Sequence, residues 1–220
     1  MIFEAKARPH YGTLWALDYE QPTPRVREAL VPAVFTWLGP ETILTAARVM
    51  DFSDPAGLQR RFSSGRRCLC AVLYGKIAAY GWVTFDEEQI GEMGMVIRLK
   101  PGEAYIWDCV TLPQYRRKGF YTALLTHVVA GLRQEGIGRI WIGTDLDNVP
   151  SLRGIARAGF SPVVDIAQTG SGGLATARFY ERPGASDKLI AAARQALATA
   201  PGIHIPSQPE PSANQTHSTG

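Results

Sequence analysis

The segment AYIWDCVTLPQYRRKGFYTALL, residues 104–125, decides the fold. It begins with an apolar run that is typical of a buried strand and ends with apolar residues at helical spacing. Between them lie three consecutive cations, Arg116, Arg117 and Lys118, followed by Gly119. Backbone N–H groups at the start of a helix lack partners within the helix and carry the positive end of its dipole. A strand, a basic loop and a helix in this order are therefore suited to bind a pyrophosphate, although a solvated basic turn between two core elements would have the same residues.

The sequence on either side alternates between helical and strand patterns. Helical spacing or helix-start signals predict helices at residues 26–38, 41–50, 54–62, 121–136 and 148–158. Apolar, β-rich runs predict a hairpin within 68–85 that turns at Gly75, and strands at 93–99, 104–112, 139–144, 159–166 and 174–181. The acidic residues 86–88 are expected in a loop. This order of elements predicts a mixed α/β (α+β) fold.

The 220 residues divide into three expected parts. Residues 1–182 have the length and the alternation of elements of one domain of ordinary size. In residues 183–200, apolar side chains recur at helical spacing after Ser186, which predicts an appended helix that either docks on the domain or stays free. Residues 201–220 are rich in Pro, Ser, Gln and Thr and have almost no large apolar residues, so we expect a disordered tail there.

Composition argues against several classes of function. Lys and Arg number 23 against 20 Asp and Glu, and this net charge of +3 gives no reason to expect nucleic acid as a partner. The three cysteines lie in apolar runs and are expected to be reduced core residues, and no Cys/His spacing typical of a metal site occurs. The sequence has no run of about 18 apolar residues and no leader pattern at its start, so we expect a cytoplasmic protein without a membrane partner.

Two linked motifs resemble those of the GNAT acetyltransferase superfamily. Arg116 and Gly119 stand where the family's acetyl-CoA-binding loop, Q/R-x-x-G-x-G/A, has its first and fourth residues, whereas Tyr121 replaces the last Gly or Ala. Downstream, residues 148–160, NVPSLRGIARAGF, resemble the family's N-x-x-(A/S) helix and the Gly-Phe pair that follows it. Both motifs occur in the family's order, and the resemblance covers about residues 68–166.

The resemblance implies a fold and a cofactor. The fold is a mixed, mostly antiparallel sheet with a splayed central strand pair, flanked by helices, and acetyl-CoA enters the gap between the parted strands without any metal. The strand backbone would hold the pantetheine arm, the loop would hold the pyrophosphate, and the second helix would pass beside the arm. The implied cofactor-binding residues are Cys109, Val110, Thr111, Arg116, Arg117, Lys118, Gly119, Phe120, Tyr121, Thr122, Asn148 and Ser151. Asn148 is equally apt as the cap of the second helix.

The attacking amine must lose a proton, and a carboxylate commonly accepts it in this family, directly or through water. Glu103 stands where the ribosomal-protein alanine acetyltransferases of the superfamily carry their base, although it is also an ordinary polar residue beside a turn. Asp108 is the second candidate. In a strand of period two, Asp108 points away from the face that residues 103, 105, 107 and 109 share, unless a bulge turns it.

The resemblance also implies roles around the thioester. The backbone N–H of Cys109 would polarise the thioester carbonyl. Its thiol is a candidate nucleophile, but direct amine attack needs no acyl-enzyme, and a free cysteine is commonly a buried apolar residue. The family commonly protonates the leaving thiolate with a Tyr of the second helix, where this sequence has Ile155. Tyr121 and Tyr105 are alternative donors, although packing is the commoner role of an aromatic residue.

We therefore expect an acyl-CoA-dependent N-acyltransferase that uses acetyl-CoA and acts on a small-molecule or peptide amine, with a homodimer left open. The alternative is a non-catalytic acyl-CoA-binding or sensing module, which the missing Tyr at position 155 and the appended helix favour. A third reading keeps the enzyme but has a longer acyl donor or a hydroxyl acceptor.

Overall fold

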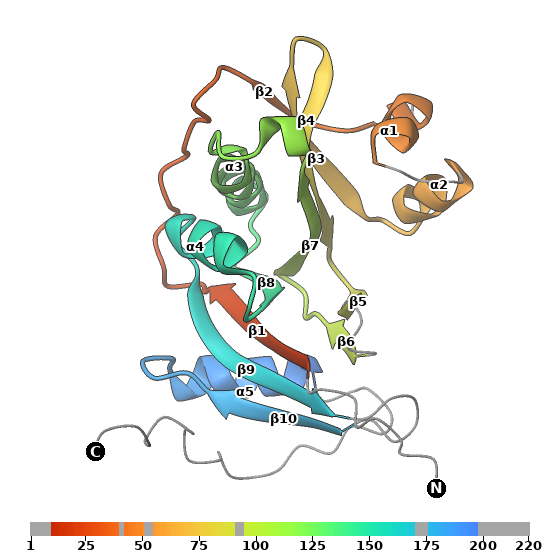
Figure 1. Ribbon diagram of the computed structural model, residues 1–220. Helices are drawn as coiled ribbons and strands as arrows, with labels where there is room; N and C mark the ends of the chain where they lie inside the picture. Colours follow the sequence, from red (N-terminus) through yellow and green to blue (C-terminus); the bar gives the residue numbers. More distant parts are fainter. Residues whose placement is uncertain (1–9, 40–41, 51–54, 91–94, 170–175, 198–220) are drawn as a thin grey trace, which may run out of the picture.

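A sheet of eight strands, in the order β10-β9-β1-β8-β7-β4-β3-β2, forms the centre of the computed structural model, which describes residues 10–39, 42–50, 55–90, 95–169 and 176–197 (Figure 1). Its strands are β1 (His10–Leu17), β2 (Val34–Trp37), β3 (Arg67–Leu73), β4 (Lys76–Thr84), β7 (Glu103–Thr111), β8 (Arg139–Asp145), β9 (Ser161–Thr169) and β10 (Thr176–Glu181). The remaining strands, β5 (Glu87–Ile90) and β6 (Met95–Arg98), form a separate hairpin. β7 and β8 are parallel and every other pair is antiparallel, which confirms the predicted mixed, mostly antiparallel sheet.

The two parallel strands part half-way along their length. β7 and β8 pair from Glu103 with Arg139 to Ile106 with Ile142. Beyond that point β7 pairs with β4 as far as Thr111, while β8 continues along β1. After Ile106, no described strand pairs with the edge of β7 that faces β8. We call the place where β7 and β8 part the fork. The expected splayed central pair is confirmed.

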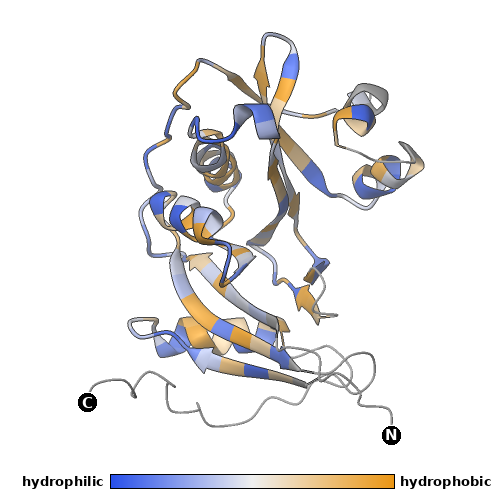
Figure 2. Ribbon diagram, in the orientation of Figure 1, coloured by the Kyte–Doolittle hydropathy of each residue, from blue (hydrophilic) through white to orange (hydrophobic). Residues whose placement is uncertain are grey.

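Helices cover both faces of the sheet. α3 (Phe120–Gln134) and α4 (Val149–Arg157) lie on one face, and α1 (Ile43–Val49), α2 (Pro55–Ser63) and α5 (Asp187–Leu197) lie on the other (Figure 1). A short 3₁₀ turn, η3 (Pro113–Tyr115), joins β7 to the loop before α3. Alternate residues of β7 separate the two cores, because Ala104 and Ile106 pack with α3 whereas Tyr105 packs in the core that α5 covers. Hydrophobic residues lie mainly along the strands and on the helices (Figure 2).

The appended helix α5 docks on the sheet. It contacts β9 and β6. Its buried side chains are Leu189, Ile190, Ala193, Ala196 and Leu197, at the helical spacing that the sequence shows. Of the two alternatives left open for residues 183–200, docking is therefore the one observed over Asp187–Leu197. The predicted tail at 201–220 lies outside the described residues.

Several predicted elements are confirmed within a few residues. These are the helices at 41–50, 54–62, 121–136 and 148–158, the hairpin within 68–85, and the strands at 93–99, 104–112, 139–144, 159–166 and 174–181. The hairpin turns at Tyr74 and Gly75, both of which have positive φ, the geometry that a two-residue turn between twisted strands requires.

The predicted helix at 26–38 is wrong. Residues 22–33 have no helical turn and run past α4 and α3 to β2 (Figure 1). Pro32 has no N–H and disfavours helical backbone in the residue before it. Backbone donors of this segment bond to other elements instead: the Arg27 N–H donates to Thr126 Oγ1 at 3.0 Å and the Leu30 N–H to the Lys118 carbonyl at 2.8 Å.

Two further differences concern strands. Glu87 and Glu88, expected in a loop, lie in β5 and pair with Arg98 and Ile97 of β6. β1, for which the sequence analysis predicts no element, occupies a central place between β8 and β9. Its sequence HYGTLWAL is a short apolar run without clear alternation, and periodicity alone does not identify such a strand.

Candidate active site

A bulge in β7 lies at the fork. Tyr80 of β4 pairs with Val110 and Trp82 pairs with Trp107, so the two residues Asp108 and Cys109 face the single residue Gly81. Asp108 takes the extra position with a φ of 44°. A Cβ atom at Gly81 would lie 2.8 Å from the Cys109 sulfur, which shows why glycine stands opposite the bulge.

The bulge changes which side chains share a face. Strict alternation puts Cys109 with Trp107 and turns Asp108 away. Instead, Trp107 and Asp108 line the same cavity, whereas Cys109 packs in the core below α3. The prediction from alternation alone is therefore wrong here, and the bulge that it allowed for is the reason.

A cavity of about 880 Å³ opens between the fork, α3 and α4. It is lined by Cys109, Val110, Thr111, Arg116, Arg117, Gly119, Phe120, Tyr121, Thr122, Asn148, Val149, Pro150, Ser151, Arg153, Gly154 and Arg157. We call it the helix-side cavity. It brings together every residue predicted to bind the cofactor except Lys118, whose Nζ donates to the Gln114 carbonyl at 3.2 Å and faces the Tyr115 ring.

The lining of the helix-side cavity suits a polyanion. Arg116, Arg117, Arg153 and Arg157 contribute guanidinium groups, and none of the described lining residues is a carboxylate. Gly119 caps α3 with a φ of 79°, and Arg117 also has a positive φ of 62°. Successive backbone N–H groups in such a turn, at the start of a helix, form a concave anion site. The residues present therefore fit the phosphates of a coenzyme A molecule.

Asn148 serves as a helix cap and also lines this cavity. Its Oδ1 accepts a hydrogen bond from the Ser151 N–H at 3.2 Å, at the start of α4. Both roles considered for Asn148 in the sequence are compatible with this position. Arg157, one turn beyond Arg153, is a lining residue that the sequence analysis did not single out.

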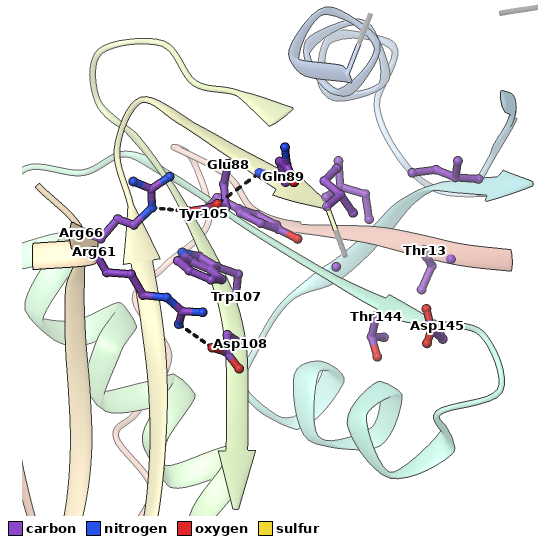
Figure 3. A pocket seen from close by; sticks show the side chains of 15 residues that line it. Thr13, Arg61, Arg66, Glu88, Gln89, Tyr105, Trp107, Asp108, Thr144 and Asp145 are labelled. Atoms are coloured by element: carbon purple, nitrogen blue, oxygen red, sulfur yellow. Dashed lines mark hydrogen bonds and ion pairs between the residues drawn. The ribbon is translucent and has the colours of Figure 1, made fainter. Parts of the chain in front are cut away.

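A second cavity, of about 820 Å³, lies on the opposite face of the sheet at the same fork. We call it the open-face cavity. Figure 3 shows Arg61 and Arg66 on one side of it and Thr13, Thr144 and Asp145 across from them.

Two ion pairs and an aromatic wall shape the open-face cavity. Arg61 Nη1 lies 2.5 Å from Asp108 Oδ2, and Arg66 Nε lies 2.5 Å from Glu88 Oε2 (Figure 3). The Arg61 guanidinium also stacks 4.4 Å from the centre of the Trp107 ring. The sequence analysis missed Glu88, because residues 86–88 were expected in a loop. The only signal in the sequence was the place of Glu88 at the end of the acidic stretch 86–88 that follows the predicted hairpin.

Glu103 is not brought to either large cavity. It is buried at the start of β7, and its Oε1 accepts from Arg139 Nη1 at 2.6 Å. Its Oε2 accepts from the Trp141 indole at 3.2 Å and from the Lys100 N–H at 3.3 Å. It borders only a separate cavity of about 190 Å³ beside α5. The structure thus separates Glu103 from Asp108 and Cys109 and surrounds it with structural partners.

The Cys109 thiol is held in its neutral form. Burial, and then the negative charge of Asp108, raise its pKa well above the ordinary thiol value. The thiol donates to the Trp107 carbonyl at 3.7 Å. Because the thiolate is the nucleophilic form, this environment disfavours attack by Cys109.

The two tyrosines considered as proton donors lie on different faces. Tyr105 lines the open-face cavity with its hydroxyl beside Gly143, and burial raises its pKa. Tyr121 lines the helix-side cavity. Ile155 is fully buried in the core between α3, α4 and the sheet.

The described residues indicate neither a metal site nor a membrane-spanning helix. Within the described ranges, no group of three or more His, Cys, Asp or Glu side chains is placed to hold a metal ion. In the same part of the chain, no helix is long and apolar enough to cross a membrane.

Three comparisons relate this chain to protein families, to curated proteins and to solved structures. The model of the acetyltransferase (GNAT) family matches residues 31–160. No curated protein matches the sequence with significance. Similar solved structures include a putative GNAT-family acetyltransferase from Novosphingobium aromaticivorans, with 18% identity over 74% of this chain, and a GNAT-family acetyltransferase from Colwellia psychrerythraea, with 16% identity over 74%. A GCN5-related N-acetyltransferase from Sphaerobacter thermophilus is 18% identical over 72% of this chain. The TM-score is 0.53 for each of the three. The matches cover 65, 57 and 50% of those chains, so this chain spans between half and two thirds of their length. At these identities the likeness is one of fold.

Proposed function

This chain belongs to the GNAT acetyltransferase family, and on that premise we propose that it transfers the acetyl group of acetyl-CoA to a primary amine by direct attack in a ternary complex. The observation that carries the proposal is the fork, where two cavities on opposite faces of the sheet meet at adjacent residues. Cys109 lines the helix-side cavity and Asp108 lines the open-face cavity. Donor and acceptor can therefore approach one reaction centre from opposite sides.

The helix-side cavity supports the donor site. The cationic loop and the start of α3 would bind the phosphates, and the exposed backbone of β7 beyond Ile106 would pair with the pantetheine amides. Acetyl-CoA supplies the activated acyl group. In this arrangement the Cys109 N–H would donate to the thioester oxygen, where negative charge develops during attack.

The open-face cavity supports the acceptor site. Asp108 is the carboxylate that reaches the fork, where it pairs with Arg61 at 2.5 Å. We assign Asp108 the role of base, acting directly or through a water molecule. Glu103 receives a structural role through Arg139, in place of the catalytic one expected from the resemblance.

The proposal is tested by calorimetric titration with acetyl-CoA and by following thiol release with a panel of primary amines. We expect saturable binding of acetyl-CoA, and release of CoA that depends on the amine. Absence of acetyl-CoA binding would contradict the proposal. Tight binding without turnover for any amine would favour the non-catalytic acyl-CoA-binding module, for which the apolar Ile155 is the supporting observation.

A further inference from the structure

We propose that Arg61 is a positioning residue, which holds the carboxylate of Asp108 for proton transfer from a guanidinium site at the fork. Besides Asp108, this guanidinium site consists of the indole rings of Trp82 and Trp107. The inference rests on the proposed function and deepens it, because it concerns how the assigned base is held. Arg61 acts through the Asp108 carboxylate and contacts neither the acyl donor nor the amine.

Two indole rings form the floor of the guanidinium site. Trp82 of β4 pairs with Trp107 of β7, and their ring centres lie 6.0 Å apart with 34° between the ring planes. The guanidinium carbon of Arg61 lies 4.4 Å from the centre of the Trp107 ring and 5.0 Å from that of Trp82. Both distances are within the range over which an indole face attracts a cation. The rings therefore hold the guanidinium in addition to its ion pair with Asp108.

The packing of α2 carries Arg61 to this site. Phe62, the next residue of α2, packs against the Trp82 ring with 5.2 Å between ring centres. Leu58, one turn earlier on the helix, is fully buried in the same core as Trp82. Apolar residues one turn apart lie on one face of a helix and anchor it on the sheet. The place of Arg61 is thus set by the hydrophobic contacts of its helix as well as by its charge.

The Asp108 carboxylate depends on Arg61 for its direction. Arg61 Nη1 donates to Asp108 Oδ2 at 2.5 Å (Figure 3), and no other described residue hydrogen-bonds this carboxylate. Asp108 is the extra residue of the bulge, with a φ of 44°, and such a residue is not held by the regular ladder of the sheet. The hydrogen bond engages one oxygen and leaves Oδ1 open to an amine.

The other ion pair of the open-face cavity is arranged differently. Glu88 Oε2 accepts from Arg66 Nε at 2.5 Å, and Glu88 Oε1 accepts from the Gln89 N–H at 3.1 Å. Both oxygens of Glu88 are therefore engaged. Of these two paired carboxylates, Asp108 is the one that keeps a whole oxygen free of described donors.

The Arg61–Asp108 pair is better suited to positioning than to stabilising the fold. The two side chains are 24% and 31% exposed, and partly exposed ion pairs contribute little to stability. A guanidinium donates from a rigid plane and keeps its own proton, so it directs the carboxylate without taking part in proton transfer. Loss of Arg61 should therefore leave the protein folded while the carboxylate loses its fixed direction.

The test removes Arg61 and then supplies free guanidinium. With an accepted amine, kcat of Arg61→Ala should fall about tenfold at an unchanged KM for acetyl-CoA, because a misdirected reacting group costs about that much or more. Guanidinium, added at concentrations too low to unfold the protein, should bind over the indole rings and restore most of the lost kcat. Urea, which is planar but uncharged, should restore none. Arg61→Lys returns the charge without the planar donors and should recover only part of kcat.

Arg67→Ala is the matched control. Arg67 Nη1 lies 2.6 Å from Glu135 Oε2, and its guanidinium lies 4.1 Å from the centre of the Trp37 ring. Arg67 thus has the same kind of partners as Arg61 but is not among the described residues that line either large cavity. Its variant should keep the kcat of the wild type and show no response to guanidinium. An equal loss of kcat in both variants would assign the effect to general stability and overturn the inference.

A double-variant cycle shows whether Arg61 acts through Asp108. In the Asp108→Asn background, Arg61→Ala should cause little further loss of kcat, and guanidinium should restore none of it, because the positioned group is gone. Fully additive losses would overturn the inference and leave Asp108 as the base. An Arg61→Ala variant that keeps kcat and has only a raised KM for the amine would also overturn it, since Arg61 would then contact the substrate.

Failure of the proposed function gives different results. Undiminished kcat in Asp108→Asn would remove the assigned base and this inference with it. Absence of acetyl-CoA binding by the wild type would overturn the proposed function as a whole. Loss of kcat in Asp108→Asn combined with an unchanged kcat in Arg61→Ala would overturn this inference alone.

Discussion

Asp108 and Cys109 line different cavities on opposite faces of the sheet, and the bulge in β7 sets which residue faces which cavity, because it turns Asp108 to the face of Trp107 and Cys109 to the face of α3. The same bulge lies where β7 has parted from β8. One local irregularity therefore brings a carboxylate to the acceptor side and a backbone donor to the acyl-donor side of a single point.

Asp108→Asn tests the base. Asparagine tolerates a left-handed backbone at least as well as aspartate, so the bulge should persist at φ 44°. We expect kcat to fall about 100-fold with little change in the affinity for acetyl-CoA, because the proton acceptor is lost while the helix-side cavity is untouched. Steady-state kinetics and calorimetry measure the two quantities. The control is Asp165→Asn, which removes a carboxylate paired with Arg182 outside both cavities. A pH–rate profile identical to that of the wild type would place the base elsewhere.

Gly119→Ala tests the phosphate loop. The substitution puts a side chain at φ 79°, a left-handed conformation that costs an ordinary residue about 1–2 kcal/mol. The loop should relax and turn its N–H groups away from the phosphates, lowering the affinity for acetyl-CoA about tenfold. Gly136→Ala is the matched control, because Gly136 has a φ of 85° in open space at the other end of α3. Both variants should lose similar stability in urea, and equal loss of acetyl-CoA affinity in both would contradict the assignment.

The helix-side cavity was predictable from sequence because its parts are local. The strand, the loop and the start of α3 are consecutive between 109 and 122, and α4 begins only a few tens of residues later. The strand–loop–helix order fixes which backbone groups face the helix-side cavity. Lys118 shows the limit of this reasoning, since a side chain within a basic run can point away from the site that its neighbours form.

The open-face cavity was not predictable in the same way. Arg61 comes from α2, Glu88 from β5 and Asp145 from the end of β8, and their meeting depends on the order of strands in the sheet. β1 contributes Thr13 from a central strand that carries no clear periodic signal. The bulge at Asp108 is likewise set by pairing with β4, where Gly81 opposite is its only local trace.

Glu103→Gln separates a structural role from a catalytic one. The carboxylate is buried and pairs with Arg139, which in turn pairs with Asp18 at 2.6 Å. Removing one charge leaves Arg139 partly unpaired in the interior, and the loss of a buried partner typically costs about 3–5 kcal/mol of unfolding free energy. We expect a marked fall in urea stability and an unchanged pH–rate profile. A preserved stability with a large loss of kcat would restore Glu103 as the base.

His127 should make the stability of the fold depend on pH. Its ring stacks on Phe35 at 3.9 Å between centres, and its Nε2 is buried without a hydrogen-bond partner among the described residues. Burial lowers its pKa below 6.5, against a smaller opposite effect of Glu28. Between the two pKa values the unfolded chain binds more protons than the folded one, so stability is complete above about pH 6.5 and falls as the pH drops below that value. Urea unfolding of the wild type and of His127→Phe, which keeps the stack, measures the effect as the difference between the two curves from about pH 8 to 5. The wild type should lose stability more steeply on acidification than His127→Phe, whereas parallel curves would show that His127 titrates alike in the folded and unfolded chains.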